Sequence, residues 1–455
     1  MQQTNVLEYL EHTVKRLPDK VAYSNESEGL TFAEVYHDSR AIGSYLNSKG
    51  YYGEPVVVFM KKHPKAIAAF YGCVYGGNYY VPIDEEMPRF RIDLIFDNLR
   101  PKVMICDEST QEMAKTFDFD GELLIYDEVS QSPINEDALA QIRDKQLDTD
   151  PIYIVFTSGS TGVPKGVVAC HRSVIDYIEN LSEVLEFNED TRFANQTPLY
   201  FDACLKELYP TLKFGASTVI VPKSLFMFPV KLVEFLNEHK VNTVCWVVSA
   251  LTMISSFKTF DKVVPEYLHT VAFGSEVFPI KQFKIWKETL PNAKFTNLYG
   301  PTETTGMCCY YKVNRDFELG EVMPVGRPFH NTEIILLNDE NKRAAQGEVG
   351  EICVRGTSLT IACADADSGR TSRSVLCIHH CQSRKGLDHL PYRHILHPAF
   401  HPEPMSSALG CEAQVEVVHD TASGPSSVPF LRRQVCPVRF GRRQDSEAFP
   451  YRQDA

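Results

Sequence analysis

The chain has 455 residues, 44% of them hydrophobic and 23% charged, so it is long enough for more than one domain and has a globular composition. Its net charge of −13 gives a nucleic-acid partner no electrostatic support, and no stretch approaches the roughly 20 apolar residues of a membrane span. The first residues lack a signal-peptide pattern, so we expect a cytoplasmic protein with neither a nucleic-acid nor a membrane partner.

Short apolar runs alternate with helix-like segments along the first 300 residues. Apolar residues at 6, 7, 10 and 14 predict a short amphipathic helix. Buried strands are then predicted at 56–60, 103–106, 123–126, 153–156, 218–221, 243–248, 270–273 and 294–298, with helices between several of them, as at 231–239 and 280–289. This alternation indicates an α/β fold with mainly parallel sheets, in which ligands bind at the carboxyl ends of the strands.

The loop after the predicted strand at 153–156 is rich in glycine and hydroxyl residues and is closed by a lysine. Glycines let backbone N–H groups converge on an anion, hydroxyls add donors, and lysine adds a positive charge. It is not a Walker loop, because Pro164 precedes the lysine and Gly166 follows it. The sequence therefore predicts a polyphosphate-binding loop that consists of Thr157, Ser158, Gly159, Ser160, Thr161, Gly162 and Lys165.

Five segments resemble motifs of the adenylate-forming superfamily, which includes acyl-CoA ligases, luciferases and the amino-acid adenylation domains of nonribosomal peptide synthetases. They are YVPID at 80–84, TSGSTGVPKG at 157–166, YFDAC at 200–204, NLYGPTETT at 297–305 and GEVGEI at 347–352. The resemblance implies a large domain at 1–356, with stacked, mostly parallel sheets flanked by helices. It also implies a small β-barrel-like part, for which strands are predicted at 333–337 and 348–355.

The resemblance implies ATP and Mg²⁺ as cofactors and assigns roles around them. Lys165 and its loop would hold the β- and γ-phosphates, and Thr302 would contact the α-phosphate. Glu303 would bind Mg²⁺, which takes hard oxygen ligands. Tyr299 would stack on adenine, whose pocket Gly274, Ser275, Glu276 and Gly300 would line. The catalytic residues implied in this way are Thr302, Glu303 and Lys165.

Asp202 matches the aspartate with which amino-acid-activating members bind the ammonium group of the substrate. A buried carboxylate needs a cationic partner, and this ammonium supplies one. Acyl- and aryl-acid activators have no such ammonium, so Asp202 argues against an acyl- or aryl-CoA ligase. The side-chain pocket implied by the resemblance comprises Ala203, Lys206, Trp246, Val271, Phe273, Leu298, Gly306 and Met307.

The identity of the amino acid stays open at this point. Lys206 follows Asp202 by one helical turn, so it either points inward, toward an acidic side chain such as glutamate, or extends to solvent. The LYP string at 208–210 also resembles D-alanine–carrier protein ligases. In such enzymes the activated amino acid passes to a phosphopantetheine thiol, which here would belong to a separate carrier protein.

The composition changes sharply near residue 360. There are 23 lysines and 12 arginines up to that position, but one lysine and ten arginines after it. We expect 357–455 to be a divergent or frame-shifted tail that is poorly ordered. The family's small C-terminal domain, with its Y-x-T-G-D hinge and N-G-K lysine, is not recognisable, so we expect slow adenylation. The alternative is a non-catalytic fragment that binds ATP and an amino acid.

Overall fold

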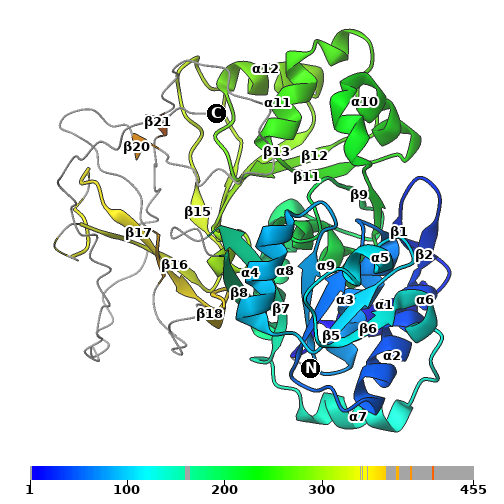
Figure 1. The fold of residues 1–455 in the computed structure, drawn as a ribbon. Coiled ribbons are helices and arrows are strands. Elements are labelled where there is room, and N and C mark those ends of the chain that lie inside the picture. Colours follow the sequence, from blue (N-terminus) through cyan, green and yellow to red (C-terminus); the bar gives the residue numbers. More distant parts are fainter. Residues whose placement is uncertain are drawn as a thin grey trace, which may run out of the picture. The chain divides into compact units, whose positions relative to one another are not determined.

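The computed structural model describes residues 3–158, 164–338, 340, 342–345, 347–364, 376–378, 390–391 and 412–413, with side chains up to residue 361 except that of Ser158. These residues belong to the first of two units, Met1–Val418, and only that unit is described below. Two large sheets and a small one organise it (Figure 1).

The seven-stranded sheet is parallel over most of its width. Its strands, in spatial order, are β18 (Ala362–Ala364), β8 (Pro164–Cys170), β7 (Pro151–Ser158), β4 (Tyr79–Ile83), β3 (Pro55–Phe59), β5 (Val103–Cys106) and β6 (Glu122–Ile125). Neighbours from β7 to β6 run parallel, whereas β8 pairs antiparallel with both β7 and β18. Every residue of β3 and β5 is buried, as expected for parallel strands covered on both faces.

The nine-stranded sheet carries most of the predicted site. Its strands, in spatial order, are β15 (Arg327–Pro328), β14 (Cys309–Lys312), β13 (Lys294–Tyr299), β12 (Thr270–Gly274), β11 (Thr243–Val247), β9 (Arg192–Asn195), β10 (Ser217–Ile220), β1 (Val21–Ser24) and β2 (Gly29–Thr31). Neighbours from β13 to β1 are parallel, so the chain leaves β9, β11, β12 and β13 at one edge of the sheet.

Helices cover both large sheets. They are α1 (Leu7–Val14), α2 (Phe32–Ser48), α3 (Pro64–Tyr75), α4 (Arg89–Leu99), α5 (Gln111–Ala114), α6 (Tyr126–Val129), α7 (Glu136–Lys145), α8 (His171–Leu185), α9 (Leu205–Phe214), α10 (Pro229–Glu238), α11 (Val248–Ser256) and α12 (Ile280–Thr289). One core cluster joins both sheets to α3, α8 and α9. A second packs the nine-stranded sheet against α10–α12, and a third packs the seven-stranded sheet against α4. Helices and sheets therefore alternate in layers, which confirms the predicted α/β class.

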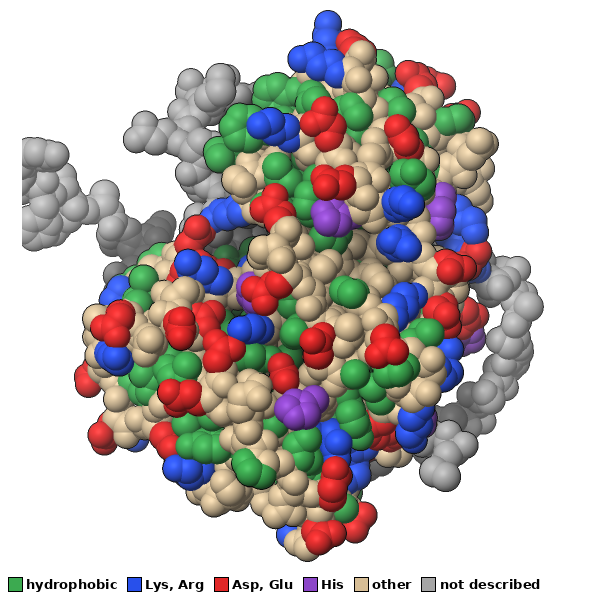
Figure 2. Space-filling model, turned by 90° about the vertical axis from the view of Figure 1, so that its right-hand side faces the viewer, with side chains coloured by type: hydrophobic (Ala, Val, Ile, Leu, Met, Phe, Trp, Pro, Cys, Tyr) green, Lys and Arg blue, Asp and Glu red, His purple; other side chains and the backbone are tan. Residues whose placement is uncertain are grey.

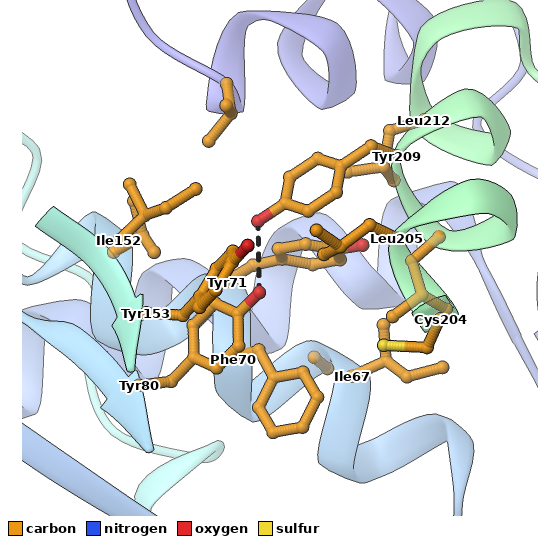
Figure 3. Packing of buried hydrophobic residues seen from close by; sticks show 14 of the residues in the cluster. Ile67, Phe70, Tyr71, Tyr80, Ile152, Tyr153, Cys204, Leu205, Tyr209 and Leu212 are labelled. Atoms are coloured by element: carbon orange, nitrogen blue, oxygen red, sulfur yellow. Dashed lines mark hydrogen bonds between the residues drawn. The ribbon is translucent and has the colours of Figure 1, made fainter. Parts of the chain in front are cut away.

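The core between the two sheets contains a cluster of buried tyrosines (Figure 3). The hydroxyls of Tyr23 and Tyr71 lie 2.9 Å apart, and those of Tyr80 and Tyr209 lie 3.4 Å apart. Tyr23 also donates to the Leu208 carbonyl at 2.7 Å. Burial raises the pKa of each of these four phenols above its ordinary value. The core thus consists mainly of apolar side chains but also contains pairs of neighbouring tyrosine hydroxyl groups.

The small β part contains an antiparallel sheet of β16 (Thr332–Leu337), β17 (Glu351–Gly356) and β19 (Leu376–Ile378). A further antiparallel pair consists of β20 (Leu390–Pro391) and β21 (Glu412–Ala413). The chain between β17 and β18 stays attached to the large sheets, because the Ile361 N–H donates to the Val168 carbonyl at 2.9 Å.

The predicted elements are mostly found, with differences at their ends. The helix predicted at 280–289 is α12 with those same bounds. The strands predicted to end at Tyr126 and Val248 end one residue earlier, because these two residues begin α6 and α11. Two acidic residues follow Tyr126 in the first turn of α6, where they interact favourably with the helix N-terminus. Short apolar runs do not show where such a strand passes into a helix.

The surface view in Figure 2 shows lysine and arginine side chains interspersed with acidic ones, without a continuous basic area on that face. Within the described part of the chain, no helix combines the length and apolar character needed to cross a bilayer.

Candidate active site

Three motif-bearing segments leave the same edge of the nine-stranded sheet. The short helix η1 (Asp202–Cys204) comes after β9, the turn Gly274–Glu276 ends β12, and the short helix η4 (Thr302–Thr304) comes after β13. Strand β8, which begins with Pro164 and Lys165, contacts η4. The predicted convergence of these segments at the carboxyl ends of parallel strands is therefore present.

The predicted phosphate loop connects the antiparallel strands β7 and β8, in which Thr157 lies opposite Lys165. The Thr157 hydroxyl is 3.5 Å from the Lys165 carbonyl oxygen. Gly159, Ser160, Thr161 and Gly162 lie outside the described residues, as does the side chain of Ser158. Their phosphate-binding role stays a prediction, but the structure fixes both ends of the loop.

The turn that carries Glu303 is held by close backbone contacts. A Cβ on Gly300 would lie 2.3 Å from the Gly306 carbonyl oxygen and 2.5 Å from the Met307 Cα. The Thr304 hydroxyl donates to the Pro301 carbonyl at 2.8 Å. Only glycine at position 300 permits this approach.

The segment after β17 also braces this turn. The backbone N–H and the hydroxyl of Thr360 donate to the Glu303 carbonyl at 2.9 and 3.0 Å, and the Thr305 hydroxyl donates to the Ser358 carbonyl at 2.7 Å. Thr302 and Glu303 remain partly exposed. Their backbone is thus fixed while their side chains stay accessible.

The predicted adenine-binding turn at the end of β12 is also tight. A Cβ on Gly274 would lie 2.4 Å from the Leu298 carbonyl oxygen, and Ser275 has a φ of 68°, in the left-handed region. The Glu276 carboxylate accepts the Ser249 backbone N–H at 2.6 Å, in the first turn of α11. Glu276 therefore ties the turn to a helix N-terminus, and its contact with adenine stays a prediction.

Tyr299 lines a narrow apolar crevice of about 10 Å³. The other lining residues are Cys309, Val325, Gly326, Pro328, Ile334, Leu336 and Ile352. The adenine role of Tyr299 stays a prediction.

The Asp202 carboxyl group lies among protein groups, although the residue as a whole keeps partial exposure. Burial raises its pKa to about 6, against the opposing effect of the Lys206 ammonium, while Glu303 raises it further and the Thr302 hydroxyl lowers it. Asp202 is therefore a neighbour of Thr302 and Glu303, which come from a separate motif. A carboxyl group in such surroundings gains strongly from a nearby cation.

Lys206 points into the protein, which answers the question that the sequence left open. It is only 1% exposed and lies on α9 within electrostatic reach of Asp202 and Glu207. Burial raises the pKa of Glu207 to about 8, so this carboxyl is mostly protonated at neutral pH. Asp202 is consequently the ionised partner of Lys206 before a substrate binds.

A second buried lysine supports this region from the seven-stranded sheet. Lys62 donates to the carbonyls of Asn195 and Gln196 at 2.8 and 3.0 Å, and burial lowers its pKa to about 7. The Asn195 amide donates to one Glu207 carboxyl oxygen at 3.2 Å. The other oxygen of Glu207 has no hydrogen-bond partner among the described residues.

Predicted pocket residues belong to two different core clusters. Trp246, Val271 and Phe273 belong to the core between the nine-stranded sheet and α10–α12, and the Trp246 indole donates to the Ala194 carbonyl at 2.7 Å. Leu298 and Met307 belong instead to the core between the two large sheets. Because side chains alternate across a strand, the residues that share the Leu298 side are Cys245 and Ala272. The first three therefore lie on the other face of the sheet from Leu298, and their role in the substrate pocket stays a prediction.

Sequence reasoning missed two polar groups on the Asp202 side. Tyr177 of α8 is buried, and its ring packs under Gly306, whose added Cβ would lie 2.8 Å from two ring carbons. Glu207 is the second. Neither residue belongs to a motif, and only the packing of α8 and α9 between the sheets reveals them. Gly306 thus contacts Tyr177, and the pocket roles of Ala203 and Gly306 stay predictions.

The donor set at this edge fits a magnesium ion. Magnesium prefers oxygen ligands and uses one or two carboxylates together with substrate phosphates. The partly exposed Glu303 carboxylate stands beside Asp202, close to the strand that begins with Lys165. Among the described residues no group of three or more potential metal-binding side chains is found.

Comparison with known families gives a match that spans residues 10–361, to the model described as AMP-binding enzyme. The chain belongs to the AMP-binding enzyme family. The D-alanine–D-alanyl carrier protein ligase of Bacillus licheniformis is 27% identical over 359 residues, which cover 78% of this chain and 70% of that protein. The L-proline–[L-prolyl-carrier protein] ligase of Pseudomonas fluorescens is 26% identical over 369 residues, which cover 78% and 72% of the two chains.

The fold also resembles that of solved relatives. The nonribosomal peptide synthetase FmoA3 superposes with a TM-score of 0.73 at 22% identity, over 81% of this AMP-binding chain and 39% of FmoA3. At that identity the likeness concerns the fold. The family assignment is consistent with the five motifs and with the adenylate-forming reaction class that they imply.

Proposed function

We propose that this chain binds ATP and Mg²⁺ and activates an amino acid as its aminoacyl-adenylate. The observation that carries the proposal is the surroundings of Asp202, a carboxyl group beside Thr302 and Glu303 whose pKa burial raises. An amino acid supplies the ammonium that such a group needs, and acyl or aryl acids do not. The neighbouring η4 turn and the strand of Lys165 supply the nucleotide side of the same site.

In the proposed reaction a substrate carboxylate oxygen forms a bond to the α-phosphorus of ATP. The bond from that phosphorus to the bridging oxygen breaks, and pyrophosphate leaves with the electron pair. Two unit charges 4 Å apart repel by about 4 kcal/mol at an effective dielectric near 20. The site must therefore present cations and dipoles before the anions meet.

The residues of this chain divide that task. Lys165 and its loop would hold the β- and γ-phosphates, and Thr302 would donate to the α-phosphate. Glu303 would hold magnesium, which supplies charge neutralisation when bound. Asp202 would orient the substrate through its ammonium, so that the carboxylate faces the α-phosphate.

Two side-chain classes are proposed for the amino acid. The buried Lys206 favours an acidic side chain such as that of glutamate, because a second carboxylate would neutralise it once Asp202 is engaged by the ammonium. The similarity to a D-alanine–D-alanyl carrier protein ligase favours D-alanine instead. The acidic class has the support of this chain's own geometry.

Transfer of the activated amino acid to the phosphopantetheine thiol of a separate carrier protein is proposed from the names of the two relatives. We further propose that adenylation by these 455 residues is slow. The one lysine after residue 360 is Lys385, in the context SRKG and not NGK. A cation placed at developing negative charge contributes on the order of 10²- to 10⁴-fold to a rate.

The test is ATP–pyrophosphate exchange with a panel of amino acids that includes glutamate and D-alanine, together with direct binding of Mg-ATP. Lys165→Ala is expected to weaken Mg-ATP about 10- to 100-fold, since a charged hydrogen bond contributes roughly 1.5–3 kcal/mol. Lys262→Ala, on the exposed surface, is the matched control and should bind Mg-ATP like the parent chain.

Three outcomes would count against parts of the proposal. Unchanged Mg-ATP affinity in Lys165→Ala would refute the nucleotide site. Mg-ATP binding without any amino-acid-dependent exchange would favour the non-catalytic alternative. Exchange as fast as that of an intact relative would contradict the proposed impairment.

A further inference from the structure

Tyr177 is a buried residue that none of the five motifs contains. It lies on α8, is 1% exposed, and packs within the core between the two large sheets. An added Cβ on Gly306 would lie 3.1 Å from the Tyr177 hydroxyl oxygen. The glycine of the YGPTETTG turn therefore makes room for this ring, and the hydroxyl lies directly beneath the turn that carries Glu303.

The hydroxyl of Tyr177 faces a set of polar groups. It interacts electrostatically with Asp202, Glu207 and the Cys245 thiol, and the Met307 backbone N–H lies nearby. No hydrogen bond of normal geometry engages this hydroxyl among the described residues. A buried hydroxyl without a partner costs roughly 1–3 kcal/mol, so a missing acceptor at this position is physically significant.

The same small region holds other groups that are not fully satisfied. One carboxyl oxygen of Glu207 has no partner within the described part of the chain, and Lys206 adds a buried ammonium beside it. The Cys245 thiol interacts electrostatically with both Glu207 and Lys206, so these groups share one region of the core. Leu298 and Met307 belong to the same core and supply apolar neighbours.

We propose that Tyr177 is an additional specificity residue, whose hydroxyl donates a hydrogen bond to the polar end of the substrate's side chain. The inference rests on the proposed function, since it concerns the amino acid that Asp202 would hold. A side-chain carboxylate would accept from the Tyr177 hydroxyl, the Lys206 ammonium and the protonated Glu207 carboxyl. Such a ligand gives the unpartnered Tyr177 hydroxyl an acceptor and gives the Lys206 ammonium a counter-charge.

The charged side chains around the proposed binding position of the substrate side chain are consistent with an acidic substrate. The α9 segment contributes Lys206 and Glu207, η1 contributes Asp202, and η4 contributes Glu303. Lys62, between β3 and α3, also interacts electrostatically with Glu207. When the substrate ammonium pairs with Asp202, Lys206 has to share that carboxylate with a second cation. A neutral side chain would leave the ammonium buried without a full counter-charge, which is unfavourable.

The experiment measures equilibrium binding of free amino acids to the full 455-residue chain, saturated with magnesium and a non-hydrolysable α,β-methylene analogue of ATP. The probes are L-glutamate, L-glutamine and D-alanine. The parent chain is expected to bind glutamate at least about tenfold more tightly than glutamine, because a charged acceptor is lost in glutamine. Tyr177→Phe should weaken glutamate about 10- to 100-fold and leave the affinity for the nucleotide analogue unchanged.

Tyr209→Phe is the matched control, because it also removes one buried hydroxyl but one that is paired with Tyr80. It should leave the preference for glutamate over glutamine intact. Lys206→Gln gives a second test that does not depend on the tyrosine variant folding, and it should remove that preference.

Equal binding of glutamate and glutamine by the parent chain would overturn the inference but leave the proposed function standing. So would a Tyr177→Phe chain that binds the nucleotide analogue and keeps full glutamate affinity. Failure of the parent chain to bind the nucleotide analogue would instead refute the proposed function itself.

Discussion

Asp202 shows how position alone changes the chemistry of an ordinary carboxyl group. Burial is the largest influence on it, and the nearby Glu303 acts in the same direction, while Lys206 opposes both. The resulting pKa of about 6 leaves the group ionised at neutral pH but protonated in mildly acidic solution. Its attraction for an ammonium group should therefore depend on pH in a range where an exposed aspartate does not titrate.

This pH dependence is testable. Because only the ionised Asp202 attracts an ammonium, amino-acid affinity should fall as the pH drops through about 6, by about tenfold per pH unit below it. Calorimetric titration of the preferred amino acid between about pH 4.5 and 8, with the nucleotide analogue bound, measures the effect. Asp202→Asn should bind weakly and without this slope, and a parent profile that is flat down to the pKa of an exposed aspartate would contradict the prediction.

The individual residues of the site were predictable to different degrees. Asp202 comes from one motif and Thr302 and Glu303 from another, and the structure places them together because parallel strands end at one edge. Trp246, Val271 and Phe273 lie on the sheet face that packs against α10–α12, which could not be predicted because a motif does not fix which face of a strand a side chain occupies. Tyr177 and Glu207 carried no sequence signal, because they reach the site through helix packing alone.

The tight turns at the ends of β12 and β13 are elements whose geometry depends on glycine. Gly300 approaches the backbone at Gly306 and Met307, and Gly274 approaches the Leu298 carbonyl. Backbone atoms cannot move aside as a flexible side chain can. The two turns that carry Glu276 and Glu303 are therefore held in place by close packing of the main chain.

Gly300→Ala tests this rigidity. The added methyl would lie 2.3 Å from the Gly306 carbonyl oxygen, so overpacking is expected to cost about 1–3 kcal/mol or more of unfolding free energy. Denaturant unfolding measures the loss. Gly50→Ala is the comparison, since position 50 has a φ of 80° but no atom within 4 Å of the added Cβ. A Gly300→Ala chain as stable as the parent would contradict the close approach.

Elements were more predictable than their ends. The strand–helix alternation gave the α/β class, because fully buried parallel strands appear as continuous apolar runs. The pairing of β8 with both β7 and β18 was not predictable, because antiparallel additions to a parallel sheet leave no distinct pattern in an apolar run. The boundary proposed at residue 356 stays a prediction, although the sheet continues through β18 to Ala364.

At the scale of the whole molecule, the site depends on two sheets that are joined by a shared core. The phosphate-loop strand belongs to the seven-stranded sheet, whereas Asp202, Glu276 and Glu303 follow strands of the nine-stranded sheet. The helices α8 and α9 lie in the core between them. Loss of packing in that core would therefore separate the proposed nucleotide-binding residues from the proposed amino-acid-binding residues.

The tyrosines of this shared core have an optical consequence. Tyr23, Tyr71, Tyr80 and Tyr153 are buried, and burial raises the pKa of each phenol, so they should stay un-ionised in alkali for as long as the fold persists. On base titration, phenolate absorbance should rise first from accessible tyrosines and then in a cooperative step that coincides with loss of far-ultraviolet circular dichroism. A single smooth rise in phenolate absorbance at the pH of free tyrosine would mean that water reaches the interior. Phenolate absorbance thus reports whether the two large sheets remain packed against each other.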